Sequence, residues 1–324
     1  MKPAGKTVIA SAPGSTMLLG EHAVLAGKQA LVAALLPRIE VRLLPRTDTA
    51  VTVTSQLGSA HTCIKQFCLP NSLRFVCAAI KPHLHCLSTG FDLQIHSPLS
   101  HKQGLGSSAA VTVATLAAIR HWLRLPTHTT CMLQEAVAAV RQAQNGLGSG
   151  ADVAASIVGG LLAFRCLPCP NIVQQFAQTP PILLFYCGYK TPTPQVIDHV
   201  QQQHRHNMAA YAKICNAMDR LVTQALPICA QQKWRQLGPL LNQGHTLLAQ
   251  LGVSTPLLNS MANTLHTTPN IWGAKISGAG LGDCVVAVGS SQKRDWPWQQ
   301  LDTHITAQGF HVQYNTEPSA PPCA

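Results

Sequence analysis

The sequence is poor in acidic residues. Its 324 residues include 12 Asp and Glu against 23 Lys and Arg, which gives a formal net charge of +11. Such a balance can indicate binding of nucleic acid, of a membrane surface or of an anionic small molecule. The basic residues form no run of five or six, however, so a nucleic-acid partner is not expected. The charge fits phosphate-bearing small molecules at least as well.

Long apolar runs are also missing. No stretch reaches the ~18–20 apolar residues of a membrane-spanning helix, and the most apolar candidate, near Ala109 to Leu123, contains Arg120 and His121. No long apolar segment precedes Pro13, so neither a secretory signal nor membrane binding is expected. The 12 cysteines are irregularly spaced, which favours reduced thiols over a disulfide framework. A cytoplasmic, globular protein is therefore the default expectation.

Two common nucleotide-binding fingerprints are absent or incomplete. No Gly-x-x-x-x-Gly-Lys-Ser/Thr motif occurs anywhere in the chain. Gly104, Gly106 and Ala109 satisfy a relaxed dinucleotide fingerprint, which also requires an acid about 20 residues later to bind the ribose. No acid lies between Asp92 and Glu135. The sequence therefore predicts neither a P-loop domain nor a dinucleotide-binding domain.

What the sequence does contain is three glycine clusters that also carry serine. The first lies directly before a strong helical pattern, so its free backbone N–H groups and the helix dipole would converge on a phosphate. Ser107 and Ser108 add hydroxyl groups that can bind a phosphate or a Mg²⁺ ion. One such cluster can equally be a turn or a helix cap, but three together favour a phosphate site. The clusters are Gly104–Ala109, Gly146–Ala151 and Ser277–Asp283.

The scarcity of acids draws attention to Asp152. Only Glu135 and Asp152 are acidic between residues 93 and 197, and Asp152 directly follows the second glycine cluster. Phosphoryl transfer needs donors that cradle the phosphates, a metal ion and one residue that orients or deprotonates the acceptor. Asp152 is the candidate for this last role. It can also cap a helix that starts at Val153, and the two roles are compatible.

Strand and helix patterns alternate irregularly along the chain. This predicts an α+β fold with two lobes that meet near residue 180, an N-terminal lobe over 1–180 and a C-terminal lobe over 181–314. The Pro-rich tail over 315–324 is expected to be frayed. Strands are predicted at 7–10, 30–44 (alternating from Ile39 onward), 91–96, 160–164, 182–187 and on both sides of a loop within 274–288. Helices are predicted at 109–125, 132–144, 195–226 (stopped by Pro227) and 234–251.

Three segments resemble the motifs of the GHMP kinase superfamily, in the order in which that family has them: Ala12–Gly27, Gln103–Ala110 and Gly273–Cys284. The resemblance implies an N-terminal lobe like domain 2 of ribosomal protein S5, a ferredoxin-like C-terminal lobe, and a cleft between them for ATP and the acceptor. It implies that Ser108 is a Mg²⁺ ligand and that Asp152 is catalytic. It places the ATP phosphates at Gly104, Leu105, Gly106, Ser107, Ser108 and Ala109. It places the acceptor substrate at Ser15, Glu21, His22, Lys190, Gly278, Ala279 and Gly280.

Within this superfamily the chain resembles the mevalonate-pathway branch, with two acceptors open. The segment Gly20–Leu25 is similar to mevalonate kinases. Gln142–Ala155 and the pair Asp283-Cys284 are similar to phosphomevalonate kinases, and Arg141 stands where mevalonate kinases have a metal-binding Glu. Two motifs against one favour 5-phosphomevalonate, with mevalonate as the alternative. A phosphate acceptor needs charge compensation more than deprotonation, and Lys102, Arg141, Lys190 and Lys275 would supply it.

One residue departs from the family pattern. The first motif normally carries Lys after Pro-Gly, in contact with the transferring phosphoryl group, and here this position is Ser15. A missing cation at that place would weaken stabilisation of the transition state. Either another basic residue substitutes for it, with Lys190 as the candidate, or activity is low, or the chain is a catalytically silent protein that binds a metabolite. The expected ligands are ATP, Mg²⁺ and a small-molecule acceptor, and a homodimer is compatible with the sequence.

Overall fold

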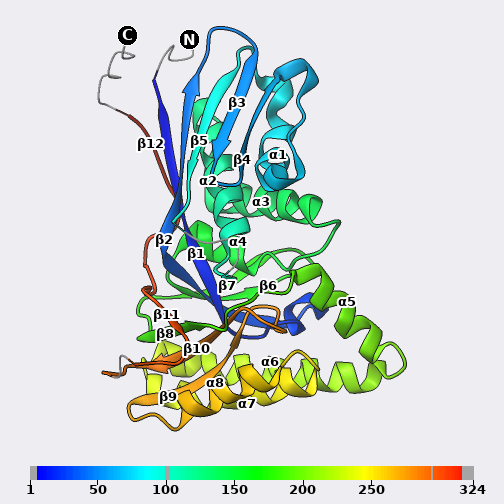
Figure 1. The fold of residues 1–324 in the computed structure, drawn as a ribbon, viewed down its shortest axis with the longest axis vertical. Helices are drawn as coiled ribbons and strands as arrows, with labels where there is room; N and C mark the ends of the chain where they lie inside the picture. The colour runs from blue at the N-terminus through cyan, green and yellow to red at the C-terminus, as the bar shows by residue number, and fades with distance from the viewer. Residues whose placement is uncertain (1–5, 99–102, 293–294, 316–324) are drawn as a thin grey trace.

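The structure of the chain, a computed structural model, describes residues 6–98, 103–292 and 295–315. Its strands form two separate sheets (Figure 1). The larger sheet has eight strands: β1 (Val8–Leu19), β2 (Gln29–Pro45), β3 (Ala50–Ser55), β4 (Gly58–Cys63), β5 (Phe91–His96), β6 (Leu161–Arg165), β7 (Asn171–Phe176) and β12 (His311–Tyr314). The smaller sheet has four: β8 (Ile182–Tyr186), β9 (Ile271–Ser277), β10 (Cys284–Gly289) and β11 (Gln299–Leu301).

The long strands β1 and β2 organise the larger sheet, whose main path runs β12-β1-β2-β5-β3-β4. The β3–β5 pair is parallel, and the other strand pairs of this sheet are antiparallel. One half of β2 (residues 40–45) pairs with β5, and the other half (residues 29–33) pairs with β6. β1 therefore runs through the larger sheet and reaches the smaller one with its C-terminal end, where the first sequence motif lies (Figure 1).

Four helices cover one face of the larger sheet (Figure 1). They are α1 (Arg74–Ile80), α2 (Ser107–Trp122), α3 (Thr129–Ala143) and α4 (Ala151–Val158). α2 is buried on nearly all sides, because it packs against β1 and β2 as well as against the other three helices. This fits its Ala-rich sequence, since a helix without a solvent-facing side needs no polar stripe.

The central strand β10 of the smaller sheet is buried on both faces. Along β10, Cys284, Val286 and Val288 join the core of the larger sheet, whereas Val285 and Ala287 join a second core. Successive strand residues point to opposite faces, so this strand reads as a continuous apolar run. Helices α6 (Met208–Ala230), α7 (Trp234–Gln250) and α8 (Pro256–His266) lie below this sheet in Figure 1, and α5 (Thr193–His204) leads into them. The strand order β11-β8-β10-β9 is the one expected for a ferredoxin-like lobe.

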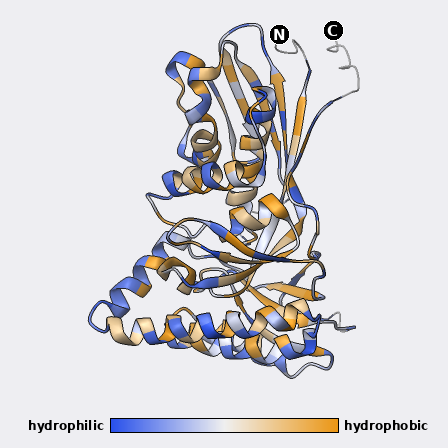
Figure 2. Ribbon diagram, turned by 180° about the vertical axis from the view of Figure 1, so that it is seen from behind, coloured by the Kyte–Doolittle hydropathy of each residue, from blue (hydrophilic) through white to orange (hydrophobic). Residues whose placement is uncertain are grey.

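Hydropathy follows this layering. In Figure 2 the apolar residues concentrate on the strands and on the helix faces turned toward them, whereas the outer turns of the lower helices are largely polar. Among the residues that the structure describes, no helix combines the length and the apolar character needed to span a membrane.

The α+β class and the two-lobed arrangement are confirmed. The strand predicted at 91–96 is observed with the same bounds. The helix predicted at 195–226 is wrong, because Asn207 starts a new helix by accepting a hydrogen bond from the N–H of Ala210. Pro227 does not stop that helix, which continues to Ala230.

The path of the last strand differs from a simple division of the chain at residue 180. The sheets change between β7 and β8, near that residue, but β12 returns to the larger sheet and pairs with β1. The last strand of the smaller sheet is therefore β11. The expected C-terminal lobe over 181–314 also includes β12, which belongs to the larger sheet. The tail over 316–324 lies outside the described residues.

Candidate active site

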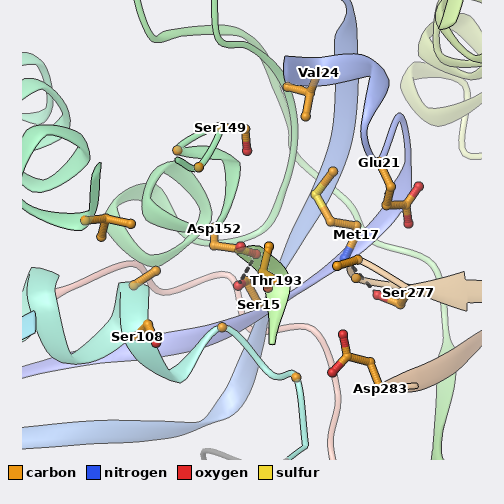
Figure 3. A pocket seen from close by; sticks show the side chains of 18 of the residues that line it. Ser15, Met17, Glu21, Val24, Ser108, Ser149, Asp152, Thr193, Ser277 and Asp283 are labelled. Carbon is orange, nitrogen blue, oxygen red and sulfur yellow. Dashed lines mark hydrogen bonds between the residues drawn. The ribbon is translucent and has the colours of Figure 1, made fainter. Parts of the chain in front are cut away.

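A pocket opens where the first motif on β1 meets the smaller sheet. All three glycine clusters line it, although they are far apart in sequence (Figure 3). The first contributes Gly104, Gly106 and the first turn of α2, and the second contributes Gly148, Ser149 and Gly150. The third contributes Ser277, Gly278, Ala279 and Asp283. The structure thus brings residues of all three clusters into the lining of one pocket.

The first cluster packs directly against Ser15 of β1. The N–H of Ser15 donates to the carbonyl of Leu105 over 3.0 Å. Gly106 has a φ of +66°, and a Cβ atom there would lie 1.9 Å from Ser15 Oγ. Only glycine therefore fits at this position. The contact brings the start of α2, with Ser107, Ser108 and Ala109, to the wall of the pocket.

Asp152 faces the same strand from the other side. It lies in the first turn of α4, and Ser15 Oγ donates to Asp152 Oδ1 over 2.7 Å (Figure 3). Its expected second role as a helix cap is wrong, because Gly150 occupies the N-cap position and no side chain caps this helix. Burial raises the pKa of Asp152, opposed by the hydrogen bond from Ser15 and by the charge of Lys190. One serine thus joins the carboxylate to the loop expected to bind phosphates.

A second carboxylate, Asp283, enters the pocket from the third cluster. It is 2% exposed, and its Oδ1 atom has no hydrogen-bond partner among the described residues. A Cβ at Gly104 would lie 2.6 Å from that oxygen, so Asp283 closely approaches the first cluster. Lys190 Nζ lies 3.9 Å away. Burial raises the pKa of Asp283 to about 6, against the opposing charge of Lys190.

Hydrogen bonds fasten the first motif to the third. The hydroxyls of Thr16 and Ser277 lie 2.7 Å apart, and the N–H of Met17 donates to Ser277 Oγ over 3.0 Å. His22 Nε2 lies 2.7 Å from the carbonyl of Ala279 and donates to it, because a carbonyl only accepts. Burial lowers the pKa of His22, so its neutral form is favoured. These hydrogen bonds connect the first motif, on and after β1 of the larger sheet, to the end of β9 in the smaller sheet and to the loop that follows it.

Two of the cations expected to compensate a second phosphate are committed elsewhere. Lys275 is fully buried and pairs with Glu21 and with the carbonyl of Ile276. Burial raises the pKa of Glu21 and lowers that of Lys275, while the attraction between them opposes both changes. Arg141 is outside the pocket lining and donates to the carbonyl of Gly148 and to Cys166 Sγ. Lys102 lies outside the described residues.

Most of the expected site residues therefore come together, with two exceptions. Leu105 is buried and takes part only through its carbonyl, and Gly280 packs against Val253 instead of lining the pocket. The pocket lining includes Ser15, Glu21, His22, Gly104, Gly106, Ser107, Ser108, Ala109, Asp152, Lys190, Gly278 and Ala279. Thr16 and Met17 also line the pocket and lie within the first motif, and Ser277 and Asp283 line it from the two ends of the third cluster, but none of these four was among the expected site residues. Ile197 of α5 lines the pocket as well and lies in none of the motifs, so the sequence carried no signal for it.

The donor set of this pocket fits a magnesium ion held mainly by a nucleotide. The part of the chain that the structure describes has no group of three or more His, Cys, Asp or Glu side chains that could hold a metal. Mg²⁺ keeps several waters and needs only one or two protein oxygens beside the phosphates. The half-buried hydroxyl of Ser108 lies in the pocket wall at the start of α2 and is such an oxygen. A Mg²⁺–nucleotide complex is thus compatible with the residues present.

Three glycine-rich clusters and a carboxylate at a pocket between two lobes fit the class of small-molecule phosphotransferases. Family models agree with this class. One described as the N-terminal domain of GHMP kinases matches residues 71–160, and one for their C-terminal domain matches residues 225–295. The mevalonate kinase of Pyrococcus horikoshii is 30% identical over 318 residues, which cover 90% of this chain and 91% of the relative. The chain therefore belongs to the GHMP kinase family.

Solved structures show the same fold. The mevalonate kinase of Methanococcus jannaschii superposes with a TM-score of 0.77 at 21% identity and covers 92% of this chain and 98% of its own. The phosphomevalonate kinase of Streptococcus pneumoniae, in complex with phosphomevalonate and AMPPNP, has a TM-score of 0.73 at 18% identity and covers 88% and 93%. At these identities the two structures establish the fold and do not separate the two acceptors.

Proposed function

We propose that this chain is an ATP-dependent kinase of the mevalonate pathway, with mevalonate as its acceptor. The observation that carries the choice of acceptor is the charge of the pocket. Among the described lining residues, Lys190 is the only Lys or Arg. It lies 3.9 Å from Asp283 and lines the same pocket as Asp152, while Glu21 is paired with Lys275. An acceptor without a phosphate group suits this environment.

This proposal replaces the preference for 5-phosphomevalonate drawn from the motifs. That preference rested partly on Arg141 and Lys275 as partners of a second phosphate, and both are held in other contacts. Phosphomevalonate would add about two negative charges beside ATP, in a pocket whose own acids already outnumber its free cation. The P. horikoshii relative, which matches nearly the full chain, is named a mevalonate kinase. Both arguments support the alcohol acceptor.

The roles of the chain's residues follow from their positions. The backbone of Gly104–Ala109 and the start of α2 would bind the ATP phosphates. Asp152 would orient the acceptor hydroxyl and take its proton, and a pKa raised by burial brings this base closer to the working pH. Ser108 would hold a Mg²⁺ ion, which when bound neutralises phosphate charge. Ser15 keeps Asp152 in place through its hydrogen bond.

The experiment is release of ADP by the purified chain with Mg²⁺–ATP and mevalonate, 5-phosphomevalonate or no acceptor. Turnover with mevalonate and none with 5-phosphomevalonate is expected, and the reverse pattern would overturn the choice of acceptor. Asp152→Asn tests the catalytic role of the carboxylate, because it keeps the shape of the side chain and can still accept the hydrogen bond from Ser15. It should retain ADP binding and lose most of the turnover, about 10²–10⁴-fold. ATP binding without turnover on either acceptor would favour a silent metabolite-binding protein.

A further inference from the structure

The loop between β8 and α5 is attached to the third glycine cluster by backbone hydrogen bonds. The N–H of Asp283 donates to the carbonyl of Tyr189 over 3.0 Å, and the N–H of Cys187 donates to the carbonyl of Asp283 over 3.1 Å. Thr191 Oγ1 also donates to the carbonyl of Leu281. Lys190 lies inside this run, so its backbone is fixed relative to Asp283.

Close packing restricts the same loop further. Gly282 has a φ of +138°, and a Cβ atom there would lie 3.2 Å from the Cα of Lys190. The side chain of Lys190 retains 27% exposure and lines the pocket, whereas that of Asp283 is 3% exposed. The lysine is therefore held at its backbone and free to reach into the cleft with its ammonium group.

The ammonium group of Lys190 lies beside one of the carboxylates that line the pocket. Nζ of Lys190 lies 3.9 Å from Asp283 Oδ1, and that carboxylate closely approaches Gly104 of the phosphate loop. The positive charge of Lys190 also acts to lower the pKa of Asp152, a second carboxylate that lines the pocket. No other Lys or Arg is among the described residues that line the pocket, and β1 offers only the hydroxyl of Ser15 at this place.

We propose that Lys190 is the catalytic cation that neutralises the transferring phosphoryl group in this chain, and that Asp283 is the positioning residue that holds it beside the phosphate loop. This inference rests on the proposed function. In the transfer step, the acceptor oxygen forms a bond to the γ-phosphorus while the bond from that phosphorus to the β,γ-bridging oxygen breaks. The bond electrons leave with ADP, the hydroxyl proton passes to Asp152, and Lys190 offsets the charge on the phosphoryl oxygens.

The test compares Lys190→Ala, Lys190→Arg and Asp283→Asn with the wild-type chain, by kcat, KM for mevalonate and the Kd of Mg²⁺–ADP. Lys190→Ala should lose about 10²–10³-fold in kcat with little change in Kd, because the cation acts mainly in the transition state. Lys190→Arg should retain more of the rate, and Asp283→Asn should lose less than the alanine variant. The matched control is Lys213→Ala, an exposed lysine on α6 outside the pocket lining, which should behave as wild type.

Rescue separates a chemical role from a structural one. Added methylamine should raise kcat of Lys190→Ala severalfold and leave the control variant unchanged, and Ser15→Lys in the Lys190→Ala background should recover part of the rate. Normal turnover in Lys190→Ala would overturn the inference while the kinase assignment stands. A loss of kcat that neither methylamine nor Ser15→Lys relieves would also overturn it, since Lys190 would then act only on folding. No turnover by the wild-type chain would instead overturn the proposed function.

Discussion

Ser15 Oγ donates a hydrogen bond to Asp152 Oδ1 across 2.7 Å, while the backbone N–H of Ser15 binds the loop that precedes α2. A single residue of β1 thus connects the candidate base to the candidate phosphate loop. The sequence resemblance led us to expect a lysine at this position, and Ser15 instead supplies a neutral hydrogen-bond donor to Asp152.

The first prediction concerns this hydrogen bond. Ser15→Ala removes a donor that favours the ionised form of Asp152, so the pKa of Asp152 should rise. The acid limb of the pH profile of kcat/KM should therefore move to higher pH, because a hydrogen bond to a charged group stabilises that charged form. Activity well above that limb should change much less.

Ser156→Ala is the matched control for that variant. Ser156 lies one turn later on α4, and its hydroxyl donates to the carbonyl of Pro13 on the same strand without contacting Asp152. It should leave the acid limb where it is. An acid limb at the same pH in Ser15→Ala and wild type would mean that Asp152 is not the group that limits the rate at low pH.

The second prediction concerns the close contact at Gly106. An alanine there meets Ser15 Oγ at 1.9 Å and also has to adopt a φ of +66°. We expect Gly106→Ala to displace the loop, weaken binding of Mg²⁺–ADP at least 10-fold and lower the melting temperature. Gly146→Ala has the same conformational cost, about 1–2 kcal/mol, but at its φ of +87° the added Cβ meets no atom within 4 Å. Equal ADP affinity in the two variants, measured by calorimetry, would argue against phosphate binding at the first cluster.

Much of the site was predictable because its essential parts are local in sequence. Glycine spacing, the serines of the first cluster and the position of Asp152 next to the second cluster are visible without the fold, and the structure brings them into one pocket. Lys275 was misjudged because its environment depends on Glu21, which lies 254 positions away in the chain. The return of β12 to β1 likewise depends on pairing between the two ends of the chain.

The third prediction concerns this buried pair. Lys275 and Glu21 are 0% and 3% exposed at their side chains, so removing one partner leaves the other charge buried and unpaired. Lys275→Met should therefore lower the free energy of unfolding by about 3–5 kcal/mol, and adding Glu21→Leu should recover a large part of that loss. Chemical denaturation of the two single variants and the double variant measures the coupling. Additive losses would show that the two side chains do not interact as an ion pair.

The last prediction follows from Asp283, whose burial should destabilise the free protein when the carboxyl is ionised. Its pKa is 3.8 in the unfolded chain and about 6 in the folded one, so the folded state binds the proton more tightly. The resulting stability is fully present below pH 4 and is lost as the pH rises through 6, a difference of about 3 kcal/mol at neutral pH.

Asp283→Asn removes this penalty and keeps a residue type that tolerates the φ of +68° at this position. The variant should therefore melt several degrees above wild type at pH 7.5 and at about the same temperature at pH 4, while turning over more slowly. Asp198→Asn, at an exposed position on α5, should show no such pH-dependent gain. Equal melting temperatures of Asp283→Asn and wild type at both pH values would mean that Lys190 fully compensates the buried charge.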